Sequence, residues 1–139
     1  MSKDKPVNLL ALDVGDVRIG VALATYPTFL PQALITLSND QYFIDKLKDL
    51  IDVHHISRLI VGLPRNMDSE DTPQTLKVKN FVNQIKSKLQ LEIIFQDEFL
   101  TSKKAQEILE QRSKSYSKED IDKTAASLIL EDYINGDIK

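Results

Sequence analysis

The apolar positions in the first part of the chain form three short runs separated by polar turns. Residues 8–13, 18–24 and 32–37 each have the length and the aliphatic content of one strand. A tight turn at residues 14–17 joins the first two runs, which is typical of a hairpin. The three runs therefore predict an antiparallel meander.

After the third run the pattern changes to helices that alternate with strands. Apolar residues at helical spacing predict a helix over residues 40–53, with Asn39 as its N-cap. A short apolar run at residues 57–62 predicts a buried strand, which the sequence Gly-Leu-Pro ends. A loop over residues 63–71 then leads to Thr72, an N-cap followed by proline in the first helical position.

The last third of the chain contains one more strand and two more helices. Residues 91–96 predict the fifth strand, and Thr101 or Ser102 opens the helix that follows. Residues 111–118 are polar and predict a loop. A capping pattern and a long apolar face then predict a final helix over residues 117–134.

The order of these elements predicts an α/β fold in one domain that spans residues 1–139. Three antiparallel strands followed by strands that alternate with helices indicate a mixed five-stranded sheet with helices on both faces. We expect residues 1–7 and 136–139 to be terminal tails. Functional groups in such sheets collect at the carboxyl ends of the parallel strands.

Composition narrows the classes of protein to which the chain can belong. Of its 139 residues, 42% are hydrophobic and 28% are charged, and no cysteine is present, so disulfides and thiolate metal sites are excluded. No apolar run approaches the ~20 residues of a membrane helix, and the N-terminus has no secretory signal. These features predict a cytoplasmic protein without a membrane partner. The net charge of −3 argues against a broad basic surface for nucleic acid.

Three acidic residues stand where a charge is costly. Asp13 ends the first strand, Glu98 follows the fifth strand, and Asp122 lies in the last helix in register with the apolar residues that should face the sheet. An unpaired buried carboxylate costs several kcal/mol, so a divalent cation is the simplest compensation. Each acid also has a structural alternative: an Asx-turn for Asp13, a favourable interaction with a helix dipole for Glu98, and a first-turn helical acid for Asp122. The first and fifth strands can be neighbours in this topology, and such a pairing would bring the three acids together.

Four segments of the chain resemble the motif blocks of the YqgF (RuvX) family, and they occur in that family's order. The segments are ALDVGDVRIGVAL, VGLPRNMD, DEFLTSKKAQEIL and DIDKTAASLILEDYI. The resemblance implies a ribonuclease H-like fold and a metal-dependent nuclease. This family is described both as the nuclease that matures the 5′ end of 16S ribosomal RNA and as a Holliday junction resolvase. The resemblance also implies that Asp13, Glu98 and Asp122 are the catalytic acids.

The resemblance also suggests a cofactor and a role for two glycines. Three carboxylates suit a pair of Mg²⁺ or Mn²⁺ ions. Gly15 would let the backbone turn away with a positive φ or leave room for a phosphate, and Gly20 would mark the close approach of another backbone. The chain departs from the family at Val17, where a basic or polar residue is frequent, and at Phe99, where arginine is usual. Both departures remove contacts to phosphate and put substrate affinity in doubt.

Five further residues are candidates for contacts with nucleic acid: Arg18, Arg65, Asn66, Thr101 and Ser102. Amide and guanidinium groups are common phosphate partners, and a helix N-terminus beside Glu98 could hold a phosphate. The alternatives are a surface arginine at the start of a strand for Arg18, a rigid loop for Arg65 and Asn66, and a helix cap for Thr101 and Ser102. The lysines and arginine near residues 103–114 are interspersed with glutamates and indicate a solvated face.

Two rival functions remain open at this point. Sugar kinases and actin-like ATPases also begin with a strand, an aspartate and a glycine turn, but they need two such domains. A binding module for nucleic acid or the ribosome that has lost catalysis is the other alternative. The sequence does not distinguish RNA from DNA as the substrate, an endonuclease from an exonuclease, or a monomer from a homodimer.

Overall fold

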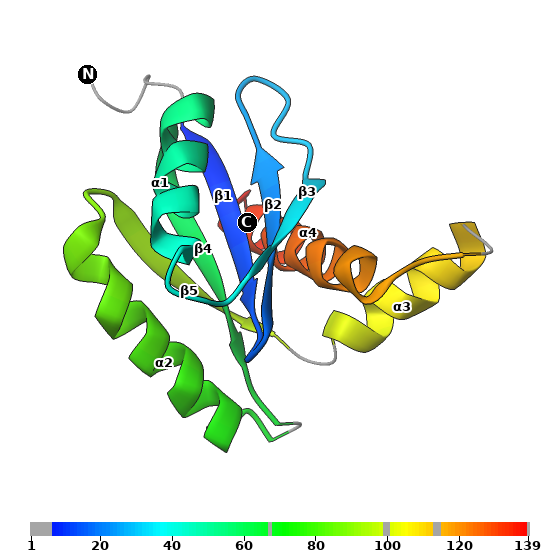
Figure 1. The fold of residues 1–139 in the computed structure, drawn as a ribbon. Coiled ribbons are helices and arrows are strands. Elements are labelled where there is room, and N and C mark those ends of the chain that lie inside the picture. Colours follow the sequence, from blue (N-terminus) through cyan, green and yellow to red (C-terminus); the bar gives the residue numbers. More distant parts are fainter. Residues whose placement is uncertain (1–6, 67, 99–100, 113–114, 139) are drawn as a thin grey trace.

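A single twisted sheet with helices on both faces forms the fold (Figure 1). The structure is a computed structural model, and it describes residues 7–66, 68–98, 101–112 and 115–138. The elements follow one another as β1 (Asn8–Val14), β2 (Arg18–Ala24), β3 (Gln32–Ser38), α1 (Phe43–His54), β4 (Ile56–Pro64), α2 (Pro73–Ile85), a short 3₁₀ turn η2 (Lys86–Lys88), β5 (Glu92–Glu98), α3 (Thr101–Arg112) and α4 (Lys118–Ile138). This succession of strands and helices confirms the one that the apolar pattern predicts.

The sheet is mixed, with the strand order β3-β2-β1-β4-β5. The first three strands form the predicted antiparallel meander, and β4 and β5 run parallel to β1. The first and fifth strands, which the sequence allows to be neighbours, are not adjacent, because β4 lies between them. The chain returns through α1 to the free edge of β1, so β4 pairs with β1 there. Strand β5 then pairs with the outer edge of β4.

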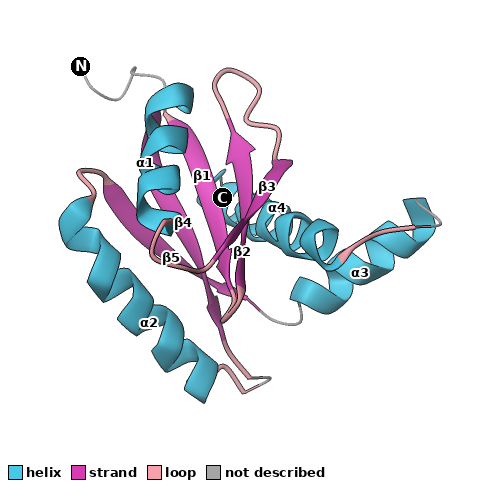
Figure 2. Cartoon of the chain, in the orientation of Figure 1, coloured by secondary structure: helices cyan, strands magenta, loops and turns pink. Residues whose placement is uncertain are grey.

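Two apolar clusters hold the helices against the sheet. Leu10, Leu12 and Val14 of β1 belong to the larger cluster, which includes residues of α1 and α2. Leu9 and Ala11 of β1 belong to the second cluster, which includes residues of α4. Because successive side chains of a strand point to opposite faces, Asp13 shares the α4 face of the sheet. Figure 2 shows α1 and α2 on one side of the sheet and α4 on the other, with α3 beside α4.

Two of the predicted N-cap contacts are confirmed and one is wrong. Thr72 caps α2 in a reciprocal capping box with Thr75, and Ser117 and Asp120 exchange backbone-to-side-chain hydrogen bonds before α4. Asn39 does not cap α1, whose N-cap position is Tyr42. The Asn39 amide instead donates to the carbonyl of Gly15 at 2.8 Å, so it braces the turn between β1 and β2.

Several elements extend further than the sequence predicts. β4 continues through Pro64 and β5 through Glu98, because the parallel pairing of the two strands persists to Pro64 and Glu98. Gly62 therefore lies inside β4 rather than at its end, and residues 63–64 are strand rather than loop. The last helix runs to Ile138, so residues 136–138 are helical and not a tail.

Candidate active site

Asp13 is the penultimate residue of β1 and lies directly opposite Gly20 of β2. It is half-buried on the face that α4 covers. Burial raises the pKa of the Asp13 carboxyl well above its ordinary value, and the negative charges of Glu98 and Asp122 raise it further. The structure therefore brings the three predicted acids close enough for two of them to act electrostatically on the third.

Glu98 approaches Asp13 from β5, across the intervening strand β4. A Cβ on Gly62 of β4 would lie only 2.9 Å from the Oε1 atom of Glu98. The Glu98 carboxyl therefore lies over the face of β4 that Gly62 leaves open. The sequence pattern predicts a strand end at Gly62 and does not reveal that this glycine leaves room for the Glu98 carboxyl. The available signal was that glycine is rare in this chain, with 4 in 139 residues.

Asp122 comes to the site on the first turns of α4. The next residues on the same side of this helix, Ala125, Ala126 and Ile129, are 0–1% exposed, which confirms the predicted sheet-facing side. A Cβ on Gly20 would lie 2.0 Å from the carbonyl oxygen of Asp122, so α4 touches the backbone of β2 at this point. This contact confirms the prediction that Gly20 marks the close approach of another backbone. The hydroxyl of Thr36 on β3 also donates to the carbonyl of Glu119, which fixes the start of the helix.

Arg18 forms an ion pair with Asp122. Its Nε atom donates to Oδ2 of Asp122 at 2.6 Å, and the two side chains are 33% and 19% exposed. The hydrogen bond and the charge of Asp122 raise the pKa of Arg18, so the guanidinium stays charged. Arg18, which sequence analysis considered for nucleic acid or the solvated surface, holds a catalytic candidate in place in this structure.

The donor chemistry at this edge is that of hard cations, since Asp13, Glu98 and Asp122 offer only carboxylate oxygens. Within the described residues, however, no group of three or more His, Asp or Glu side chains is arranged so that it could hold a metal ion. One oxygen of Asp122 is engaged by Arg18. A site with all three ligands would therefore need at least one of the three side chains to rearrange.

Gly15 shapes the turn after β1 without the positive φ that was one of its two expected roles. No described glycine has a positive φ. A Cβ on Gly15 would instead lie 2.7 Å from the carbonyl oxygen of Arg18, to which the Gly15 N–H donates at 2.9 Å. Glycine is required here because the two arms of the turn are in close contact.

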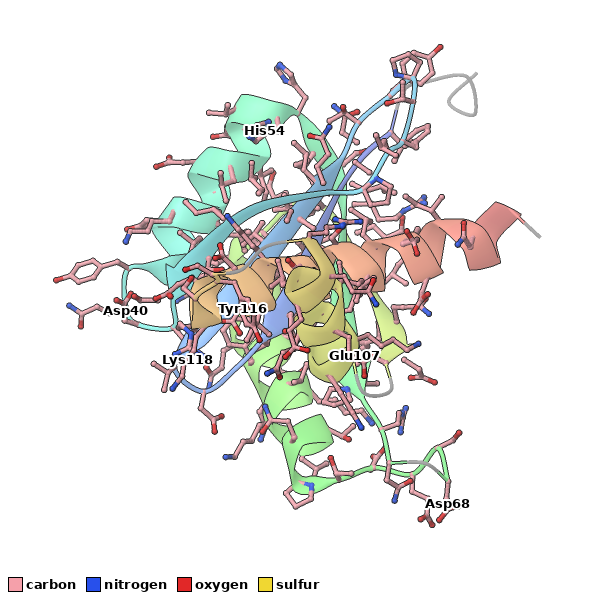
Figure 3. The ribbon with its side chains drawn as sticks, turned by 90° about the vertical axis from the view of Figure 1, so that its right-hand side faces the viewer. Asp40, His54, Asp68, Glu107, Tyr116 and Lys118 are labelled. Carbon is pink, nitrogen blue, oxygen red and sulfur yellow. The ribbon has the colours of Figure 1, made fainter. Side chains whose placement is uncertain are left out.

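The structure gives Arg65 and Asn66 roles within the loop that follows β4. Arg65 pairs with Asp71 and, at 3.1 Å, with Asp97. The Asn66 side-chain oxygen accepts from the backbone N–H groups of Asp68 and Glu70, each at 2.9 Å. These contacts are those of a rigid loop. Figure 3 shows Asp68 at the tip of this loop, far from Tyr116 and Lys118 at the start of α4.

The remaining candidates lie at or beyond the limits of the described residues. Thr101 opens α3 as predicted, but the side chains of Thr101 and Ser102 are outside the described part of the chain, as is Phe99. Val17 is 68% exposed at the tip of the β1–β2 turn. Of the helices that the structure describes, none is both long and apolar enough to cross a membrane.

Comparison with known proteins places these features in a family. The model of the RuvX family, described as Holliday junction resolvase, matches residues 7–136. A protein of Thermoanaerobacter pseudethanolicus named "Putative pre-16S rRNA nuclease" is 37% identical over 134 residues, which cover 93% of this chain and 96% of that protein. A protein of Sulfurihydrogenibium sp. with the same name is 36% identical over 129 residues, covering 91% and 89%.

A solved structure supports the same grouping at the level of the fold. T. thermophilus RuvC, in complex with a Holliday junction substrate, superposes with a TM-score of 0.58 at 8% identity. The match covers 94% of this chain and 96% of that one. At this identity the likeness shows a shared fold and no more.

Proposed function

The chain belongs to the RuvX family and has the ribonuclease H-like fold, and from this premise we propose that it is a metal-dependent nuclease that hydrolyses phosphodiester bonds. The observation that carries the proposal is the placement of Asp13, which lies close enough to Glu98 and Asp122 for both of their charges to act on it. Asp13 and Glu98 stand at the carboxyl ends of parallel strands, where such folds place their ligands.

The raised pKa of Asp13 supports the presence of a cation at this edge during function. Burial and two neighbouring carboxylates make the ionised form of Asp13 unfavourable, and a divalent cation would reverse that cost. The oxygen-only donor set of the three acids fits Mg²⁺ or Mn²⁺. Asp13, Glu98 and Asp122 are the residues that would hold the ions, with Asp122 contributing once its contact with Arg18 is rearranged.

The three acids and Arg18 then each have a defined task in the proposed reaction. Divalent ions supply an activated water and stabilise the charge that develops on the phosphate. Asp13 and Glu98 provide negative oxygens on the rigid ends of strands, and Asp122 provides one from a helix that is locked to β2. Before the ions bind, Arg18 would hold Asp122 close to the sheet through its 2.6 Å hydrogen bond.

We propose precursor 16S ribosomal RNA as the substrate, with cleavage near the 5′ end of the mature RNA. The support is that relatives covering more than 90% of this chain carry that function in their name. Such a substrate would place the protein on ribosomal particles in the cytoplasm. The second candidate is a branched DNA junction, which the description of the family model favours. A resolvase would act as a homodimer, because a junction needs two symmetric cuts.

Side-by-side cleavage tests the proposal. The purified protein is incubated with Mg²⁺ or Mn²⁺ and with either a precursor 16S RNA fragment or a four-way DNA junction of the same length. We expect cleavage of the RNA that stops on chelation. Asp13→Asn and Asp122→Asn should each lower the rate by about 100-fold or more, because metal ligands contribute several kcal/mol to the transition state.

A matched control separates catalysis from general charge effects. Asp132 lies on the same helix as Asp122 but is exposed, so Asp132→Asn should cleave at the parental rate. Cleavage that survives chelation, or that Asp13→Asn leaves intact, would contradict the proposed function. Cleavage of the junction alone would select the second candidate.

A further inference from the structure

A polar cleft lies beside the proposed active site, on the opposite face of the sheet. It has a volume of about 300 Å³, and it lies between the turn that follows β1 and one side of α2. Val14 and Gly15 form one wall, and they directly follow Asp13. Because Val14 points to the α1–α2 face and Asp13 to the α4 face, the cleft and the acids flank the same strand end.

The cleft wall on α2 carries a row of amide side chains. Gln74, Asn80 and Gln84 line the cleft together with Lys77, at spacings that place them along one side of the helix. None of the three amides forms a side-chain hydrogen bond with the rest of the described chain. Each amide offers a donor and an acceptor, as does the edge of a nucleobase.

An aromatic ring completes the cleft. Phe81 is half-buried and lines the cleft. Its ring packs on the ring of Phe43, with the ring centroids 5.6 Å apart, and this contact fixes its orientation. Unpaired bases stack on such rings and hydrogen-bond through their edges. A fixed ring that is flanked by amides is therefore a suitable platform for one base.

The charges around the cleft favour a base over a phosphate. Among the described residues that line it, Asp16 and Lys77 alone are charged, and these two exposed side chains pair with each other at 3.3 Å. A phosphate at this position would meet the carboxylate of Asp16, whereas an uncharged base would meet the neutral amides of half-buried Gln74 and exposed Asn80 and Gln84 along α2.

We propose that this cleft binds an unpaired nucleobase of the substrate strand, next to the phosphodiester that the acids cleave. The inference rests on the proposed nuclease function and deepens it, because it makes the enzyme selective for a single-stranded nucleotide beside the cut. A strand that crosses the end of β1 with its phosphate at Asp13 would deliver the neighbouring base to the α2 side.

An abasic scan of the substrate tests the inference. The cut is first located with the parent protein, and oligonucleotides are then made that lack one base at each position near the cut. Affinities are measured in the Asp13→Asn background, which binds without cutting. We expect one abasic position to weaken binding on the order of tenfold, which is within the range for loss of a stacked base.

The same scan with altered cleft residues makes the test specific. With Asn80→Ala and Gln84→Ala combined, the penalty at the sensitive position should fall to a few-fold, because the base has already lost its edge contacts and retains only its stacking on Phe81. Asn83→Ala is the matched control, since Asn83 is an exposed amide of α2 that lines a different groove, and it should retain the tenfold effect. Thermal melts verify that all three variants are folded.

The outcomes separate this inference from the proposed function. If the parent cuts in an Asp13-dependent way but no position is sensitive, or the sensitivity is the same in the double variant, only the cleft inference is wrong. If the protein neither binds nor cuts nucleic acid, both proposals are wrong. Matched RNA and DNA oligonucleotides then show whether the cleft accepts bases from either nucleic acid.

Discussion

Replacing Gly20 with alanine tests how closely α4 is seated on the sheet. The added Cβ would lie 2.0 Å from the carbonyl oxygen of Asp122 and 2.3 Å from its carbonyl carbon. Since ordinary Cβ contacts begin at 3.4 Å, strand and helix must separate by roughly 1.4 Å along this line. The atoms on both sides belong to the backbone, so a change of rotamer cannot relieve the clash.

The expected loss of stability follows from this geometry. Overpacking of a core costs about 1–3 kcal/mol, and we expect the upper end because a whole helix must move. The separation also loosens the contacts of Ala126 and Ile129, which are buried against the sheet. A loss of about 3 kcal/mol in a domain of this size corresponds to a melting temperature lower by about 10 °C.

Thermal unfolding in metal-free buffer measures this loss, and Gly136→Ala provides the control. Gly136 lies in the same helix, and a Cβ there meets no atom within 4 Å. Alanine at this position should stabilise the helix by about 0.5–1 kcal/mol. Gly20→Ala should also slow cleavage, because Asp122 moves away from Asp13. A melting temperature for Gly20→Ala within about 2 °C of the parent would refute the close seating of α4.

Three other substitutions probe the same edge of the sheet. Gly62→Ala should destabilise the protein less than Gly20→Ala, because its clashes are with the ends of side chains. It should still slow cleavage, because the added Cβ displaces Glu98. Equal losses of stability for the two variants in unfolding experiments would contradict the predicted difference. Asp13→Asn should raise the melting temperature without metal, because the Asp13 pKa is raised in the folded protein, so that stability is lost as the pH rises from the unfolded-state pKa towards the folded-state pKa. The difference in melting temperature between Asp13→Asn and the parent should shrink as the pH falls from 7 towards the unfolded-state pKa of about 3.9. A difference that grows in acid would show instead that the Asp13 carboxylate stabilises the fold. Val17→Lys should tighten binding of nucleic acid at low salt and lose that gain at high salt, because phosphate contacts release counterions; a gain unaffected by salt would indicate another kind of contact.

Local patterns in the sequence predict the elements of this fold well. The sheet-facing side of α4 follows from helical spacing, and the cap of α2 follows from Thr72 and the proline after it. Such features depend on residues within one or two turns of each other, so the sequence contains them directly. The placement of Asp122 on the buried side of its helix belongs to this class.

Features that depend on distant segments could not be predicted in the same way. The position of β4 between β1 and β5 is decided by how the chain returns through α1. Asn39 has the chemistry of a helix cap, but the carbonyl of Gly15 is the acceptor it finds in the folded chain. The partner of Asp122 is likewise a residue 104 positions away, Arg18, and no local spacing reveals it.

The two glycines that contact acidic residues explain how acids from three separate elements can meet at one edge. Gly20 lets the backbone of α4 rest on β2, and Gly62 lets the side chain of Glu98 lie across β4. The acids therefore reach Asp13 by two different routes, one through a helix and one through a long side chain. Any larger residue at either glycine would relieve the repulsion at Asp13 by separating the charges. The fold maintains that repulsion, and the cations proposed for this site would offset it.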